Sequence, residues 1–355
     1  MSSRFRIVPL VLTIAACLAT DAQASVPRAE APTLASLNAA GAVGFRTATL
    51  TRSGAARLAA TDWNGGSYTT STGETVVVYV SPSYGADASL GRKWADYFAS
   101  LAHGSELPLL RAFVAPLDEV EELCDAEALG CYGGSRLVMV GDSSAGVPPA
   151  AVAAHEYGHH VAANRLNTPW LALDWGTKRW ATYMDICRRV RAGTAYPGDE
   201  GNAYSLNPGE GFAESYRVLA ETGGTALGYD WPIVDNSFRP DAQALELIRE
   251  DVLHPWAETP ARTIRSKFPG RSRTWTLTVA TPLDGDLRVR LTVPDGGVDD
   301  VTLLAGDGKT RLATAVWDAP STKSLTYQVC GARSLTLRVT RGTAISRFTL
   351  RVTAP

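Results

Sequence analysis

Residues 150–166 read AAVAAHEYGHHVAANRL, and this stretch governs the interpretation of the whole chain. It follows Pro148-Pro149, which suit the first turn of a helix because the N–H that proline lacks has no partner there. The run is rich in strong helix formers and meets no breaker until Asn167-Thr168-Pro169. We therefore predict one long helix that carries an H-E-x-x-H pattern.

The pattern consists of His155, Glu156 and His159. Residues four apart share one face of a helix, so both imidazoles can reach a single ion while Glu156 lies beside them. Because a carboxylate in that position can accept a proton, we expect Glu156 to act as a general base. The spacing therefore predicts a metal site with a catalytic carboxylate.

A catalytic zinc site takes three protein ligands and keeps a fourth position for water, so one more ligand is needed. His160 follows His159 directly and points about 100° away from it around the helix. Ala162 and Arg165 stand where the longer three-histidine motif requires Gly and His. A third histidine is therefore not expected, and a carboxylate is.

Residues 207–214, NPGEGFAE, supply Glu210 and Glu214 one turn apart on the next expected helix. An H-E-x-x-H helix followed about fifty residues later by E-x-F-A-E resembles the gluzincin pattern, particularly the lethal-factor-type peptidases, over residues 74–225. The resemblance implies that Glu210 is the zinc ligand and that Glu214 orients the N–H of a ligand histidine. The residues alone leave these two roles exchangeable.

The same family places a tyrosine shortly before that helix to donate to the oxyanion, and Tyr204 is the match at a spacing one residue shorter. The resemblance thus implies a zinc-dependent endopeptidase in which Glu156 activates water. Extended substrate is expected to add to an exposed sheet edge, with residues 137–140 as the strand. The alternative is a secreted binding or adhesive protein whose zincin core is inactive or holds a structural metal.

Hydrophobic periodicity outlines the fold around the motif. Strands are expected at 74–80, 109–114 and 136–140, and helices at 86–101, 170–195, 209–222 and 241–253. Together with the resemblance, this order predicts an α+β zincin-like catalytic domain, a small mixed sheet plus active-site helices, over residues 74–261.

The pattern changes after a linker at 262–271. Residues 272–355 contain alternating runs such as TWTLTVAT and DLRVRLTV, which predict an all-β sandwich. This segment resembles the bacterial pre-peptidase C-terminal domain, which implies cell-surface or matrix attachment, aid in secretion, or substrate binding. Its aspartates are expected in turns rather than in a calcium site, namely Asp284, Asp286, Asp299 and Asp300.

The N-terminus predicts export. Residues 1–24 combine two arginines, an apolar stretch and a small-x-small end, which is the pattern of a secretory signal peptide. In the alternative, Ile14-Ala15-Ala16-Cys17 is a lipobox and Cys17 anchors a membrane lipoprotein. Residues 25–73 are either a lead-in or a pro-like segment, and no later run is long and apolar enough to span a bilayer.

The cysteines agree with export. Cys124 and Cys131 lie close together in a loop-like stretch and are expected to form a disulfide. Cys187 and Cys330 either pair across domains or remain separate buried thiols, and the sequence leaves both open.

The charges nearly cancel, with 34 Lys and Arg against 36 Asp and Glu. No segment of the sequence concentrates basic residues, so neither nucleic acid nor anionic lipid is an expected partner. The expected partner is a polypeptide substrate.

Overall fold

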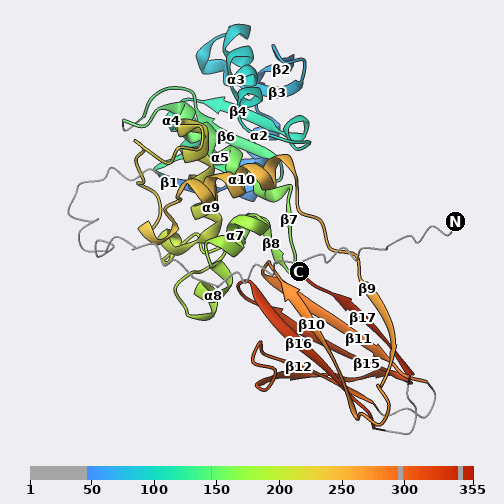
Figure 1. Ribbon diagram of the computed structural model, residues 1–355. Coiled ribbons are helices and arrows are strands. Elements are labelled where there is room, and N and C mark those ends of the chain that lie inside the picture. Colours follow the sequence, from blue (N-terminus) through green and yellow to red (C-terminus); the bar gives the residue numbers. More distant parts are fainter. Residues whose placement is uncertain (1–45, 145, 295–298, 343–346) are drawn as a thin grey trace, which may run out of the picture. The chain divides into compact units, whose positions relative to one another are not determined.

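The computed structural model describes residues 46–144, 146–294, 299–342 and 347–355. The expected signal peptide at 1–24, the lipobox cysteine Cys17 and residues 25–45 lie outside the described residues. A mixed α/β part comes first along the chain, and two antiparallel sheets follow it (Figure 1).

A six-stranded mixed sheet forms the base of the α/β part. Its strands lie in the order β1 (Arg46–Thr49), β5 (Ala128–Gly133), β6 (Arg136–Val140), β4 (Arg111–Ala115), β3 (Thr75–Val80) and β2 (Asn64–Thr69). β1 runs parallel to β5, and β3, β4 and β6 run parallel to one another, whereas β5 and β2 are antiparallel to their neighbours β6 and β3. The periodicity therefore predicted β3, β4 and β6 correctly.

The expectation that residues 137–140 form an exposed edge is wrong. β6 lies between β5 and β4, and both sides of its backbone are hydrogen-bonded. Its side chains from Leu137 to Val140 are buried, as expected for a central strand. Among the described strands, β1 and β2 form the two edges of this sheet.

Nine helices are described in the α/β part: α2 (Arg52–Ala60), α3 (Ala88–Ser100), α4 (Leu117–Leu123), α5 (Pro149–Ala163), α6 (Ala172–Trp175), α7 (Lys178–Tyr183), α8 (Ile186–Arg191), α9 (Pro208–Thr222) and α10 (Ala242–Leu253). α5 packs on β5 and β6, and α3 packs on β2 and β3. The single helix expected at 170–195 is instead three short helices. Positive φ angles at Gly176 and Asp185, 78° and 63°, interrupt the helical path.

Two antiparallel sheets make up the part that we call the C-terminal β-unit. One sheet holds β10 (Thr274–Thr281), β16 (Arg333–Thr340), β12 (Asp300–Leu304) and β13 (Arg311–Thr314). The other holds β14 (Val316–Ala319), β15 (Thr322–Val329), β11 (Gly285–Thr292), β17 (Arg347–Thr353) and β9 (Arg262–Lys267). Side chains from both sheets share one apolar core, which is compatible with the predicted β-sandwich. β9 lies within the segment expected to be a linker and pairs with β17.

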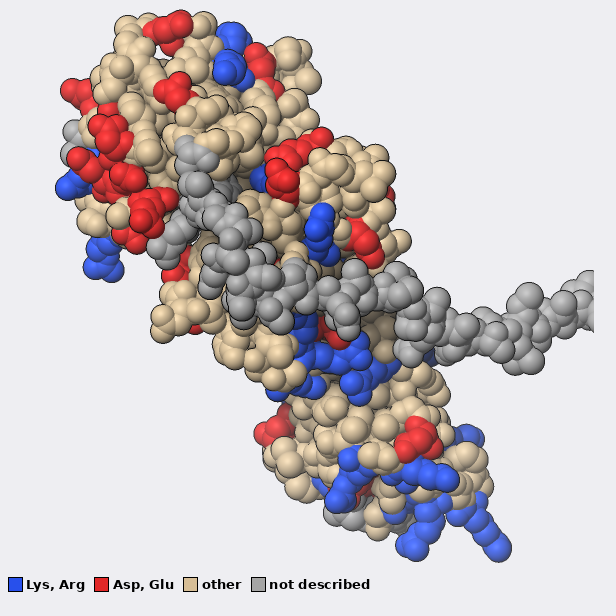
Figure 2. Space-filling view, turned by 90° about the vertical axis from the view of Figure 1, so that its left-hand side faces the viewer, with Lys and Arg blue, Asp and Glu red and all other residues tan. Residues whose placement is uncertain are grey.

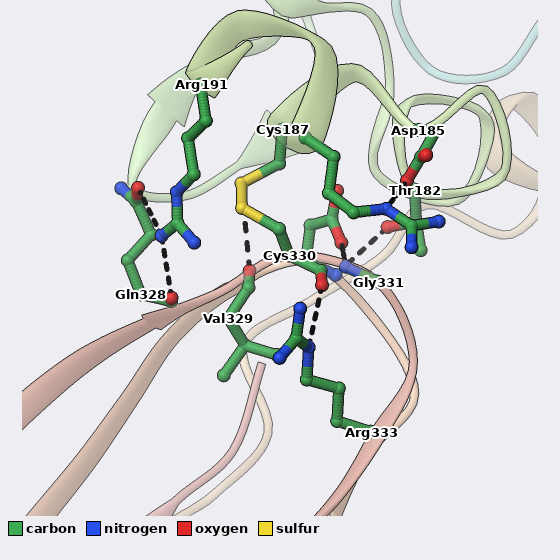
Figure 3. Close-up of a disulfide and its surroundings, with 11 residues drawn as sticks. Thr182, Asp185, Cys187, Arg191, Gln328, Val329, Cys330, Gly331 and Arg333 are labelled. Carbon is green, nitrogen blue, oxygen red and sulfur yellow. Dashed lines mark hydrogen bonds and ion pairs between the residues drawn. A yellow bond between two sulfur atoms is a disulfide. The ribbon is translucent and has the colours of Figure 1, made fainter. Parts of the chain in front are cut away.

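Two disulfides are present. Cys124 and Cys131 are joined as predicted, and Cys187 on α8 is joined to Cys330, directly after β15. Arg191 donates to the Gln328 carbonyl beside the second disulfide, at 2.8 Å (Figure 3). Both disulfides are consistent with an extracellular location. In the described part of the chain, no helix reaches the length and apolar character needed to cross a membrane.

Candidate metal centre

Two helices that pack against each other carry the site. α5 begins at Pro149, and α9 begins at Pro208 after Asn207, whose side chain caps the helix by accepting the Gly209 N–H at 3.0 Å. The helices come close because Gly158 has no side chain. A Cβ atom at this position would lie only 2.8 Å from the Cα of Ala213 on α9.

The close approach brings together the two histidines of the motif and the glutamate that the resemblance implied. Ligand atoms of His155, His159 and Glu210 all lie within 4.8 Å of one another, and the three residues are buried. The Glu210 carboxylate lies 3.2 Å from His155 Nε2 and 3.3 Å from His159 Nε2. This cluster could hold a metal ion.

Glu214 lies one turn beyond Glu210 and contacts the other nitrogen of the first histidine. His155 Nδ1 donates to Glu214 Oε2 at 3.2 Å, which leaves Nε2 directed toward Glu210. Arg217 holds the same carboxylate through two hydrogen bonds of 2.8 and 2.9 Å. Burial alone raises the pKa of Glu214, but His155 and Arg217 outweigh it, and the pKa lies below its usual value.

The carboxylates and imidazoles of the cluster shift one another's pKa values toward the charged forms. Burial lowers the pKa of His155, but the carboxylates of Glu210 and Glu214 outweigh this and raise it to about 10. Burial also raises the pKa of Glu210, whereas His159 and His155 lower it well below its usual range. With these side chains alone, the Glu210 carboxylate therefore lies against a cationic His155, and a bound cation would replace the proton of that imidazole.

Glu156 is fully buried next to the cluster, and neither of its oxygens has a hydrogen-bond partner among the described residues. Burial raises its pKa well above the usual value, although His155 opposes this. Space for the carboxyl comes from Gly130 on β5, where a Cβ would lie 2.8 Å from Glu156 Oε1. A buried polar group without a partner needs an explanation, and a metal-bound water would supply one.

Tyr204 lies on the turn before α9 and its hydroxyl donates to Glu210 Oε2 at 2.8 Å. The structure therefore places the Tyr204 hydroxyl beside the cluster. The side chain is half-buried.

His160 is not part of the cluster, because both ring nitrogens are engaged elsewhere. Its Nε2 donates to the Glu106 carbonyl at 2.9 Å, so Nδ1 accepts from the Tyr132 hydroxyl at 3.1 Å. The ring of Tyr132 on β5 stacks on His159 with centroids 6.4 Å apart. Arg165, which replaces the third histidine of the longer motif, donates to Glu106 at 2.7 Å and is structural.

A cavity of about 490 Å³ opens onto His159 and Glu210. Its other walls come from residues 48–52 and 132–134 and from the acidic side chains of Asp174 and Glu200. The first of these walls is the end of β1, so the sheet edge nearest to the cluster is β1. The cavity gives a ligand access to the otherwise buried cluster.

Comparisons with known proteins add little to this geometry. No protein-family model matches the sequence, and no curated protein matches it. Among solved structures, the chain is similar to a pre-peptidase C-terminal domain of a collagenase from Bacillus anthracis, with 11% identity and a TM-score of 0.23. The match covers 26% of this chain and 87% of that one. A TM-score this low carries no structural argument.

The sequence did not reveal several residues that shape the site. Gly130 and Tyr132 lie in a stretch rich in glycine and cysteine that was expected to be a loop but forms β5. Arg217 had a visible signal, because it lies three residues after Glu214 and four before Glu221 on one helix face.

The donor set fits zinc. Two imidazole nitrogens and one carboxylate oxygen suit zinc and similar transition metals better than calcium or magnesium, which prefer oxygen ligands alone. Three protein ligands also leave a position open.

Proposed function

We propose that the protein is a secreted zinc-dependent endopeptidase of the gluzincin type. The observation that carries the proposal is a buried carboxyl without a partner, Glu156, next to three converging donor atoms from His155, His159 and Glu210. A purely structural metal site needs the three donors but not the additional carboxyl. The combination therefore favours hydrolysis.

Zinc bound at this cluster would supply Lewis acidity and lower the pKa of a bound water toward about 7. The chain's own groups would then perform the proton transfers. Glu156 would accept a proton from the attacking water and pass it to the leaving amine, and its elevated pKa favours holding that proton between the two steps. Glu214 would keep His155 in the tautomer that presents Nε2 to the ion.

The substrate class rests on the shape of the approach to the cluster. An extended chain can add to a free strand edge by backbone pairing, which accepts many side-chain sequences. Of the two edges of the sheet, β1 is the one that borders the cavity. We therefore assign the polypeptide to the β1 side, in place of the β6 edge expected from the sequence.

The test compares the purified wild-type protein with Glu156→Gln. Zinc content is measured by mass spectrometry, and cleavage is measured on casein and on a peptide library. Glu156 is not one of the three ligands, so the variant is expected to keep its zinc while cleavage falls by about 10²- to 10⁴-fold. Glu246→Gln, an exposed carboxylate on α10, is the matched control and is expected to cleave like wild type.

Each result separates the proposal from its rivals. Bound zinc without cleavage in either protein supports a binding protein with an inactive core. Cleavage of other acyl substrates but not of peptides supports a different hydrolase. Equal peptide cleavage by wild type and Glu156→Gln contradicts the assigned base.

One substitution distinguishes two alternative roles of the Tyr204 hydroxyl. If its hydroxyl stabilises the developing oxyanion, Tyr204→Phe lowers kcat by about 10²-fold while KM and zinc affinity stay near wild type. If the hydroxyl only supports Glu210, to which it donates at 2.8 Å, zinc affinity falls instead. We expect the first result, and steady-state kinetics with a chelator titration measure both.

A further inference from the structure

The two halves of the chain carry opposite charge. Residues 262–355 hold 15 of the 34 Lys and Arg residues but only 7 of the 36 Asp and Glu residues, which is a formal charge of +8. Residues 1–261 therefore carry −10. In Figure 2, blue side chains prevail over the lower part of the view, where the C-terminal β-unit lies, whereas most red ones lie above it. The near-zero net charge of the chain hides this asymmetry.

Strand alternation places much of this charge on one face. On β9, β11 and β17, every second side chain points away from the shared core, and these outward positions are almost all Arg, Lys or Thr. The three strands are neighbours in the five-stranded sheet. We call their exposed basic side chains the basic sheet face: Arg265, Lys267, Arg288, Arg290, Arg347 and Arg351.

Several of these cations lie directly opposite one another. Arg347 pairs with Lys267 across β17 and β9, and Arg290 pairs with Arg351 across β11 and β17. Like charges at opposite positions destabilise a sheet. Asp318 lies 4.0 Å from Arg290, but no ion pair within the described residues involves Arg265, Lys267, Arg347 or Arg351. The fold therefore retains a repulsion that an external anion would relieve.

No single segment of the sequence concentrates basic residues, yet the folded chain gathers six of them on one sheet. On β11 the inward-facing Val289 separates Arg288 from Arg290, and on β17 three residues separate Arg347 from Arg351, so no basic run is visible in the sequence. Pairing of three strands about 4.8 Å apart brings them together. At one end, an open groove of about 710 Å³ is lined by three of these cations, Arg265, Lys267 and Arg347, together with Ser266, Thr292 and Thr349 and the apolar residues Val293, Pro294 and Phe348.

The side chains of the basic sheet face indicate which class of ligand it can bind. Guanidinium groups bind carboxylates and sulfates through paired hydrogen bonds, and the interleaved threonine hydroxyls can bond to sugar hydroxyls. No aromatic side chain stands among the described outward positions of β9, β11 and β17, so stacking of nucleic acid bases has no platform. No apolar side chain stands there for insertion into a lipid surface either.

We propose that the basic sheet face binds an acidic polysaccharide, a chain of sugars that bears carboxylate or sulfate groups. This site is separate from the metal cluster and independent of the proposed peptidase activity. It would hold the exported protein on an anionic extracellular matrix or cell surface through the C-terminal β-unit.

The experiment measures binding of the full-length exported protein to alginate, which carries carboxylates, and to dextran sulfate. Neutral dextran and DNA are the comparison ligands. The face variant replaces four cations by threonine, which the same strands already carry at outward positions: Arg265→Thr, Lys267→Thr, Arg347→Thr and Arg351→Thr. The control variant removes the same charge at exposed positions next to the four-stranded sheet: Arg271→Thr, Arg273→Thr, Lys309→Thr and Arg311→Thr.

Wild type is expected to bind at least one acidic glycan, to bind neutral dextran more weakly, and to release the glycan as salt rises. The face variant is expected to lose about tenfold or more in affinity, which corresponds to 1.4 kcal/mol. The control variant should lose less than about threefold. Circular dichroism and the thermal midpoint show whether each variant folds, and the single variant Arg351→Thr should still bind measurably more weakly than wild type.

Three results would overturn the proposal. If the face and control variants lose the same affinity for the glycan, binding depends on net charge and not on the basic sheet face. Wild-type affinity in a folded face variant would exclude the assigned residues. Tighter binding to DNA than to either glycan would assign the face to nucleic acid instead.

Discussion

Glu214 is a fully buried carboxylate that contacts a proposed metal ligand on one side and an arginine on the other. In Glu214→Gln the side chain keeps its size, but its amide cannot accept both from His155 and from the two N–H groups of Arg217. We expect zinc affinity to fall by about 10- to 100-fold. Competition with a chelator of known affinity measures the change.

Glu221→Gln is the control for this substitution. Glu221 is the exposed partner of Arg217 on the same helix, so its replacement removes a charge near Arg217 without changing the contact to His155. Zinc affinity should stay within about threefold of wild type. If Glu214→Gln binds zinc as tightly as wild type, Glu214 does not orient the ligand.

At the residue scale, the sequence predicted those contacts that depend on the geometry of a single helix. His155 and His159 share a face because they are four residues apart, and this follows from the helical repeat alone. Glu210 and Tyr204 came from a family resemblance, and the structure brings both to the cluster. Gly130, which makes room for Glu156, depends on the pairing of β5 with the sheet, and no local pattern encodes that contact.

The contact between α5 and α9 sets the geometry at the scale of elements. Gly158→Ala should stabilise an isolated helix by about 1 kcal/mol, because alanine is the better helix former. Here the new methyl group would press against Ala213, within 3.0 Å of its carbonyl oxygen. We expect a net loss of about 1 to 3 kcal/mol in the free energy of unfolding and weaker zinc binding, because the helices that hold the ligands are forced apart.

Ala163→Gly gives the local reference for that experiment. Ala163 is exposed at the end of α5, so its replacement reports helix propensity without packing. Urea denaturation of both variants with zinc titration separates the two effects. A more stable Gly158→Ala variant with normal zinc affinity would show that the helices tolerate the methyl group.

Helices and strands were predicted correctly where the hydrophobic pattern is uniform. The prediction failed where an element depends on strand pairing in the folded sheet. The β-branched run of β3 and the helical spacing of α3 were predicted within a few residues. β5 contains glycines and a cysteine, which favour a loop, yet it is buried between β1 and β6. The exposed edge could not be predicted, because strand order depends on which strands meet in space.

At the scale of the whole molecule, one disulfide and the hydrogen bonds beside it join residues of the α/β part to residues of the C-terminal β-unit. The Asp284 N–H donates to Thr182 Oγ1 at 3.0 Å, and the Asp284 carboxylate accepts from the Gly331 N–H, next to Cys330. No pattern in the sequence favours a Cys187–Cys330 bond over two separate thiols. Composition could not indicate this junction, because it joins residues far apart in the chain.

Asp284 makes this junction sensitive to pH. Burial raises its pKa from 3.8 to about 6, against the hydrogen bond from Gly331. Between these values the folded protein keeps a proton that the unfolded chain releases, so the contribution of this group to stability falls as pH rises from 3.8 to 6. Above pH 6 the ionised carboxylate costs the fold on the order of 3 kcal/mol. Below 3.8 it costs nothing.

Asp284→Asn should remove this dependence, because the amide oxygen can still accept from Gly331 and carries no charge. Relative to wild type, the variant should therefore gain stability progressively between about pH 4 and 6.5 and keep a constant advantage at higher pH. Thermal midpoints measured across this range test the prediction, with Asp318→Asn as the control for loss of one carboxylate on the same unit. If the thermal midpoints of wild type and Asp284→Asn change in parallel with pH, ionisation of Asp284 does not weaken the junction.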